Sequence, residues 1–145
     1  MRGLNVLNEG LKWFVFGAYG LLCALLWCFR REDLPISLAI PAATFVLLSF
    51  ARAKINRPRP YETYVLDPLI HKTTKGRGMP SRHIFSASVI AMAWLHYHIA
   101  MGIVMLSLAL LDATIRVIGG VHYPTDVAAG YLGGVLAGLF IFLLL

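Results

Sequence analysis

Apolar residues fill four long runs of the chain, at positions 11–29, 34–51, 99–118 and 127–145. A fifth run, at 83–98, is shorter and has polar residues at its start. A helix needs about 20 residues to cross the hydrocarbon core of a bilayer, and fewer where polar groups anchor its ends. The pattern therefore predicts an all-α integral membrane bundle of about five transmembrane helices.

The connections between these runs are short, and the 145 residues contain no internal repeat, low-complexity tract or separate linker. We therefore expect residues 1–145 to form a single transmembrane domain. The run at 11–29 is too long for the core of a cleavable signal peptide, so we interpret it as an uncleaved first span. Cys23 and Cys28 lie inside it without histidine or carboxylate neighbours, which is typical of small packing residues.

The composition agrees with a membrane protein, because 59% of the residues are hydrophobic and the mean hydropathy is +0.73. The net charge of +6 is concentrated, with eight of the 13 Lys and Arg residues at positions 52–82. Such a loop could contact anionic lipid headgroups or bind a phosphate ester. No aromatic residues alternate with the basic ones on a soluble platform, so we expect no nucleic-acid partner.

Three polar stretches interrupt the apolar pattern, at 57–60, 80–83 and 116–126. The first two lie at the ends of the loop between the second and third spans. The last connects the fourth span to the fifth. Because two spans separate that loop from the last connection, the span count predicts that all three stretches lie at one membrane face.

The first stretch, Arg57–Pro60, reads RPRP. Proline disfavours helix in the residue before it and lacks a backbone N–H, so the second span must end here. The arginines then lie on a stiff extended segment, and the planar fork of Arg59 suits two phosphate oxygens. A proline–arginine helix stop is also common without any ligand, so this stretch alone leaves both interpretations open.

The second stretch is typical of a helix start. Pro80 and Ser81, with Ser81 as a cap, place His83 in the first turn of the third span. The free N–H groups and the positive dipole end of that helix favour an anion, which Ser81 and Arg82 would also contact. A histidine at a helix start is also often only an interfacial polar residue.

The third stretch places three ionisable residues at the mouth of the last span. Asp126, in the first turn, can reach one ring nitrogen of His122, which fixes the tautomer and leaves the other nitrogen as a nucleophile. Arg116 lies near enough to bind charge, and Asp112, one turn earlier, could pair with it. Ionisable groups in lipid are costly and so are functional candidates, although a surface salt bridge is the simpler alternative.

Together these residues resemble the type 2 phosphatidic acid phosphatase family of membrane lipid phosphatases. Its three signatures are KxxxxxxRP, PSGH and SRxxxxxHxxxD, in that order. The corresponding residues here are Arg52, Arg59 and Pro60, then Pro80, Ser81, Arg82 and His83, then Ile115, Arg116, His122 and Asp126. The signatures extend over residues 52–126, about half of the chain, and their order and spacing are specific.

The resemblance implies a phosphatase of membrane lipids that works through a phosphohistidine intermediate. His122 resembles the nucleophile, Asp126 the residue that orients it, and His83 the general acid. The residues expected to bind the substrate phosphate are Arg52, Lys54, Arg59, Ser81, Arg82 and Arg116. Cations and helix N-termini can stabilise phosphoryl transfer, and the chain lacks the carboxylate cluster typical of Mg²⁺ sites, so we expect no metal or other cofactor.

The chain departs from the family pattern at several positions. Arg52 replaces the lysine of the first signature, and the nearby Lys54 could serve instead. Arg82 replaces a glycine, which limits close backbone approach to a phosphate but could add a ligand, and Ile115 removes a hydroxyl donor. Bacterial members usually have six spans with three before the first signature, so this chain resembles a minimal five-span form.

We therefore expect an enzyme that removes phosphate from an isoprenyl diphosphate, such as undecaprenyl diphosphate, or from a phosphatidate-like lipid. The alternative is a non-catalytic bundle that binds or transports anionic lipids and retains the anion site. The sequence predicts a multi-pass protein of the cell membrane but no particular oligomeric state. Gly130, Gly134 and Gly138 form a small-residue stripe that favours close packing inside the bundle over a dimer interface.

The orientation in the membrane depends on which cations are counted. A count of all Lys and Arg residues places the polar stretches in the cytoplasm. When the proposed site residues are left out of this count, Arg30 and Arg31 become the strongest indication of a cytoplasmic loop. They lie between the first two spans. We therefore expect the site to face the extracytoplasmic side.

Overall fold

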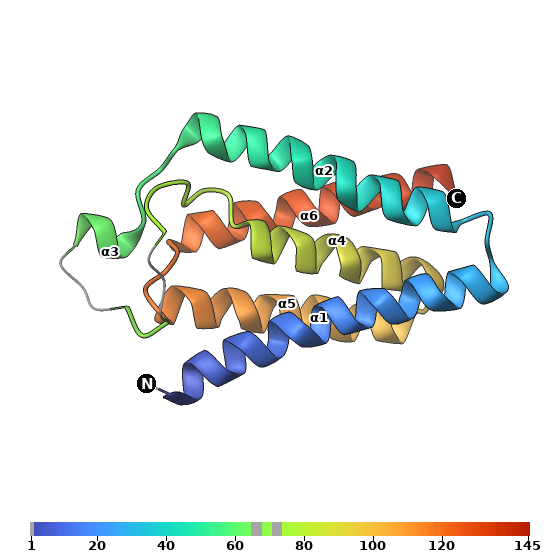
Figure 1. Ribbon diagram of the computed structural model, residues 1–145, viewed down its shortest axis with the longest axis horizontal. Helices are drawn as coiled ribbons and strands as arrows, with labels where there is room; N and C mark the ends of the chain where they lie inside the picture. The colour runs from blue at the N-terminus through green and yellow to red at the C-terminus, as the bar shows by residue number, and fades with distance from the viewer. Residues whose placement is uncertain (1, 65–67, 71–73) are drawn as a thin grey trace.

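The computed structural model is a bundle of antiparallel helices (Figure 1). It describes every residue except 1, 65–67 and 71–73. The helices are α1 (Arg2–Phe29), α2 (Leu34–Ile55), the short α3 (Pro60–Thr63), α4 (Arg82–Tyr97), α5 (Ile99–Ile118) and α6 (Pro124–Leu144). No strand occurs in the described part of the chain, so the predicted all-α class is confirmed.

Four of these helices, α1, α2, α5 and α6, are long and apolar enough to cross a membrane. Their outer surfaces expose large apolar side chains such as Trp13, Phe50 and Leu132, as expected for helices in contact with lipid. The structure therefore supports a multi-pass membrane protein. The fifth predicted span corresponds to α4, which has 16 residues and falls short of a full crossing, so the five-span form stays a prediction.

Helix α4 lies at the centre of the bundle and packs most extensively against α5 and α6. Most of its residues are buried, and many of them are small, which lets the neighbouring helices approach. The main apolar core joins α4 to α1, α5 and α6 around Leu22, Ala91 and Met105. The indole N–H of Trp94 also donates to the Ala18 carbonyl oxygen at 3.1 Å, which ties α4 to α1.

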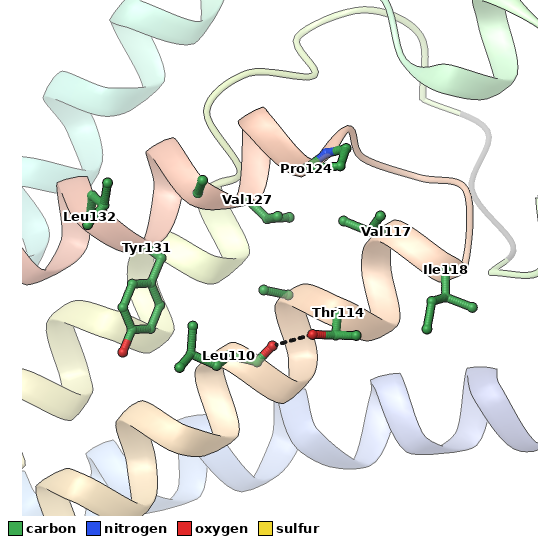
Figure 2. Close-up of a pocket in the computed structure, with 10 residues that line it drawn as sticks. Leu110, Thr114, Val117, Ile118, Pro124, Val127, Tyr131 and Leu132 are labelled. Carbon is green, nitrogen blue, oxygen red and sulfur yellow. Dashed lines mark hydrogen bonds between the residues drawn. The ribbon is translucent and has the colours of Figure 1, made fainter.

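An apolar groove of about 520 Å³ lies between α5 and α6 (Figure 2). Leu110, Val117, Val127 and Tyr131 line it, together with Thr114. The Thr114 hydroxyl donates to the Leu110 carbonyl oxygen at 3.0 Å, within its own helix. The groove therefore presents an almost wholly apolar surface.

The glycine stripe of α6 packs against α4. A Cβ atom built on Gly130 would lie 2.6 Å from the Ser81 backbone oxygen, and one on Gly134 would lie 2.5 Å from the Phe85 oxygen. A Cβ on Gly138 would lie 2.2 Å from the Met92 Cβ. The stripe therefore serves packing inside the bundle, as predicted, and holds the start of α6 against the start of α4.

We expect Gly134→Ala to destabilise the protein by about 1–3 kcal/mol, because the new methyl group overlaps a backbone oxygen that cannot move freely. Gly133→Ala is the matched control. Its Cβ would lie 3.5 Å from the Phe85 ring, an ordinary contact, and alanine favours helix. Thermal unfolding in detergent compares the two variants. Equal melting temperatures would contradict the packing role of Gly134.

The polar stretches of the sequence meet at one end of the bundle (Figure 1). Helix α2 ends at Ile55, and Asn56 closes it with a left-handed conformation at φ 41°. Helix α6 begins at Pro124, and the Asp126 carboxylate accepts the Tyr123 backbone N–H at 3.0 Å in a helix cap. The common face predicted from the span count is confirmed.

Candidate active site

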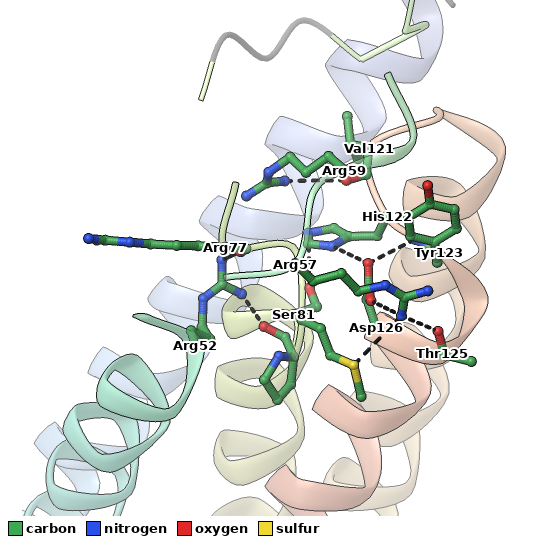
Figure 3. Close-up of polar contacts among 12 residues, drawn as sticks. Arg52, Arg57, Arg59, Arg77, Ser81, Val121, His122, Tyr123, Thr125 and Asp126 are labelled. Atoms are coloured by element: carbon green, nitrogen blue, oxygen red, sulfur yellow. Dashed lines mark hydrogen bonds and ion pairs between the residues drawn. The ribbon is translucent and has the colours of Figure 1, made fainter. Parts of the chain in front are cut away.

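His122 lies between a carboxylate and a hydroxyl at the start of α6 (Figure 3). Its Nδ1 is 3.6 Å from Asp126 Oδ2, and its Nε2 is 3.4 Å from Ser81 Oγ. All three side chains are buried. A carboxylate beside Nδ1 favours the tautomer with a proton there, in which Nε2 carries the lone pair.

Asp126 is held by more groups than the sequence predicted. Arg57 Nη1 donates to Asp126 Oδ1 at 2.9 Å and to Thr125 Oγ1 at 2.7 Å, and its guanidinium lies 4.4 Å from the centre of the Tyr123 ring. The Ser81 backbone N–H donates to the Asp126 backbone oxygen at 2.9 Å. Asp126 therefore joins the segment before α3, the start of α4 and the start of α6.

A cavity of about 630 Å³ opens beside His122, between α1, α2 and α4. The cationic residues that line it are Lys12, Arg52, Arg59, Lys75, Arg77, Arg82 and Arg116. No Asp or Glu is among the described residues that line the cavity. A dianionic phosphate is the kind of ligand that such a concentration of positive charge stabilises.

Arg59 and Arg116 are buried against the same cavity although they are far apart in sequence. Arg59 Nη1 donates to the Val121 carbonyl oxygen at 3.3 Å, which places this guanidinium next to His122 (Figure 3). Arg116 Nε donates to Asp112 Oδ1 at 3.3 Å, so the expected pairing of these two residues is confirmed. The structure thus brings the first and third signatures together at one cavity.

The structure separates the two cations proposed for the first signature. Arg52 is buried and lines the cavity, and its guanidinium donates to the backbone oxygens of Pro80 and Arg77. Lys54 is exposed and is not among the described residues that line the cavity. The expectation that Lys54 could serve instead is therefore wrong for this fold, because two positions along a helix are about 200° apart. Arg52 also fixes the loop that carries Ser81.

The start of α4 differs in detail from the prediction. Ser81 is the residue before the helix, but its hydroxyl makes no capping hydrogen bond and contacts His122 instead. Arg82 is exposed at the cavity edge, with its guanidinium 5.6 Å from the centre of the Phe45 ring. His83 lies in the first turn of α4, as predicted, and lines the cavity.

The family model described as the PAP2 superfamily matches residues 34–145, which include all three signatures. The chain belongs to the PAP2 superfamily. It is 35% identical over 85 residues to the bacitracin transport permease protein BcrC of Bacillus licheniformis. That alignment covers 57% of this chain and 42% of BcrC, so the chain matches less than half the length of this curated relative.

Two solved structures have the same fold. The crystal structure of Aquifex aeolicus LpxE superimposes with a TM-score of 0.73 at 23% identity, over 97% of this chain and 93% of LpxE. The crystal structure of the first transmembrane PAP2 type phosphatidylglycerolphosphate phosphatase, from Bacillus subtilis, gives a TM-score of 0.78 at 23% identity. This second match covers 99% of this chain and 77% of the phosphatase. The expected family and the membrane helical bundle are confirmed.

Proposed function

We propose that this chain is a phosphatase that hydrolyses a phosphate ester or diphosphate of a membrane lipid through a phosphohistidine intermediate, without a metal or other cofactor. One observation carries the proposal: His122 lies between Asp126 and Ser81 at a cavity lined by the guanidinium groups of Arg59 and Arg116. A nucleophile, its orienting carboxylate and a cationic phosphate pocket are what phosphoryl transfer requires.

In the first step, His122 Nε2 attacks phosphorus, and the bond between phosphorus and the leaving oxygen breaks. The cationic residues of the cavity stabilise the charge on the non-bridging oxygens. They include the buried Arg52 and, at the cavity edge, Arg82. His83 gives its proton to the leaving oxygen. The products are the dephosphorylated lipid and a phosphohistidine with Asp126 beside the protonated Nδ1 of the ring.

In the second step, water attacks the phosphohistidine. His83, now neutral, accepts a proton from the water as the new oxygen–phosphorus bond forms and the phosphorus–nitrogen bond breaks. Inorganic phosphate leaves, and both histidines return to their starting states. The cationic side chains supply the positive charge that a metal ion provides in many other phosphoryl-transfer enzymes.

The surroundings of the cavity favour a lipid substrate. Phe16 of α1 and Phe45 of α2 line the cavity beside its cations, and both are exposed on the outer surface of the bundle. A lipid could therefore place its phosphate among the arginines while its chain stays in the bilayer. In this proposal, residues 1–145 act as one transmembrane domain, because α1, α2, α4, α5 and α6 all contribute to the site.

A substrate panel tests the proposal. Phosphate release from phosphatidate, phosphatidylglycerol phosphate and an isoprenyl diphosphate is measured in detergent, with and without EDTA. We expect phosphate release from at least one lipid and no loss of that release with EDTA.

The name of BcrC, a transport permease protein, favours a second candidate, a non-catalytic bundle that binds or transports anionic lipids. Lipid binding without any phosphate release would support that candidate and contradict the phosphatase.

Substitution of Arg52 tests the phosphate-binding set. We expect Arg52→Ala to lower kcat/KM by about 10- to 100-fold, because the variant loses cavity charge and the two bonds that hold the loop before Ser81. Lys54→Ala is the matched control on the same helix, and we expect its kcat/KM to stay near that of the unmodified chain. Equal losses in both variants would contradict the assignment of Arg52.

We also propose that the site faces the extracytoplasmic side of the cell membrane. Arg30 and Arg31 lie in the connection between α1 and α2, at the end of the bundle opposite the site (Figure 1). Positive residues in short loops favour the cytoplasm. The C-terminus lies at the same end as these arginines, so a fluorescent protein fused there should fold and fluoresce. A dark fusion of normal abundance would contradict this orientation.

A further inference from the structure

The carboxylate of Asp112 lies between two residues of the cavity. Its Oδ2 is 2.8 Å from His83 Nε2, and its Oδ1 is 3.3 Å from Arg116 Nε. The Asp112 side chain is 3% exposed and comes from α5, one turn before Arg116, whereas His83 comes from the first turn of α4. Asp112 belongs to none of the three signatures.

This contact defines the chemistry of the His83 ring. With Nε2 2.8 Å from Asp112 Oδ2, the carboxylate favours a proton on Nε2, and Nδ1 is the nitrogen that can exchange a proton with a substrate. The negative charge also stabilises the doubly protonated ring, which is the form that a general acid needs. A carboxylate behind a functional histidine commonly fixes both the tautomer and the orientation of the ring.

We propose that Asp112 is a positioning residue for the general acid: it orients His83 and keeps a transferable proton on Nδ1. This inference rests on the proposed phosphatase function. The site then contains two histidine–carboxylate pairs with opposite tasks. Asp126 prepares His122 to donate an electron pair to phosphorus, and Asp112 prepares His83 to donate a proton to the leaving oxygen, which it recovers from water in the second step.

A different role for Asp112 would have a different kinetic result. If the carboxylate served only Arg116 or the packing of α5, its loss would slow the reaction of every substrate equally. If it acts through His83, the loss should matter only when the leaving group needs a proton. A thiolate is a far weaker base than an alkoxide and leaves without protonation, so the leaving atom separates these roles.

The experiment compares two substrates on one preparation of the full chain in detergent. The first is the phosphate monoester of the panel that the unmodified chain hydrolyses faster, phosphatidate or phosphatidylglycerol phosphate, because its leaving group is an alkoxide. The second is the same lipid with sulfur in place of the bridging oxygen of the scissile bond. Because both rates come from the same sample, their ratio does not depend on the folded fraction of a variant.

We expect Asp112→Asn to lower kcat about 10- to 100-fold on the oxygen substrate and by less than about threefold on the sulfur substrate. Thr114→Val is the matched control on α5, since the Thr114 hydroxyl bonds only within its helix in the described contacts. It should leave both rates unchanged. Equal losses of Asp112→Asn on the two substrates would overturn the inference while leaving the phosphatase proposal intact.

A double variant gives an independent result. In a chain with His83→Ala, adding Asp112→Asn should cause no further loss on the oxygen substrate, because the two residues act as a unit. If the loss in the double variant equalled the product of the losses in the two single variants, the inference would be overturned. Where Asp112→Asn does not fold, Asp112→Glu replaces it, and an equal loss on both substrates again counts against the role. If the unmodified chain releases phosphate from no lipid, the proposed function fails, and this inference fails with it.

Discussion

Replacement of His122 by alanine should abolish phosphate release, with a loss on the order of 10⁴-fold or more in kcat. No other imidazole in the described structure lies between a carboxylate and the Ser81 hydroxyl, as His122 does with Asp126 and Ser81. Alanine leaves the arginines in place, so the variant should still bind the lipid. A large fall in kcat with little change in substrate affinity would therefore identify His122 as the nucleophile.

The covalent intermediate gives a second measurement of the same prediction. A substrate with a radioactive phosphate should label the unmodified chain when the reaction is quenched within one turnover. The label should be stable in base and lost in acid, because a phosphorus–nitrogen bond has that sensitivity. His122→Ala should take up no label. A labelled alanine variant would place the covalent bond on another residue.

His98→Ala is the matched control for the loss of an imidazole. His98 lies at the junction of α4 and α5, at the opposite end of the bundle from the site (Figure 1). Its side chain is exposed, and its Nδ1 accepts only the Met101 backbone N–H among the described contacts. We expect this variant to keep its activity. Substantial activity in His122→Ala would refute the proposed nucleophile.

The sequence predicted the helices and their common polar end because both follow from local patterns. The apolar run at 99–118 coincides with α5, and the run at 34–51 falls within α2. The parity of the spans then placed residues 59 and 122 at one membrane face. No side-chain geometry was needed for that step, because a transmembrane helix has only two ends.

The contacts within the site could not be predicted in the same way, because they depend on how each helix is rotated. Helix α2 is apolar on every side, so no stripe of polar residues indicated whether Arg52 or Lys54 faces the cavity. The bond from Arg57 to Asp126 joins residues 69 positions apart across an irregular loop. The contact between His83 and Asp112 depends on the packing of α4 on α5.

Asp126→Asn should lower kcat by about 10²- to 10⁴-fold without removing any catalytic atom. The carboxylate now accepts hydrogen bonds on both oxygens: Oδ1 from Arg57 and Oδ2 from the Tyr123 N–H, with His122 Nδ1 at 3.6 Å. An asparagine has one acceptor oxygen, so its amide N–H groups must face one of these donors. The tautomer with a proton on Nδ1 of His122 then loses its stabilisation.

Arg57→Gln separates the orientation of His122 from the stability of the cluster. It removes one partner of Asp126 and leaves the carboxylate beside His122, so we expect a smaller loss in kcat, of about 10-fold. Melting temperatures of both variants in detergent show how far the buried cluster contributes to folding. If Asp126→Asn lost no more activity than Arg57→Gln at equal stability, the carboxylate would serve the arginine and not the nucleophile. If Asp126→Asn also retained the acid-labile phosphate label at the normal rate, its effect would lie in the second step, where water attacks the phosphohistidine.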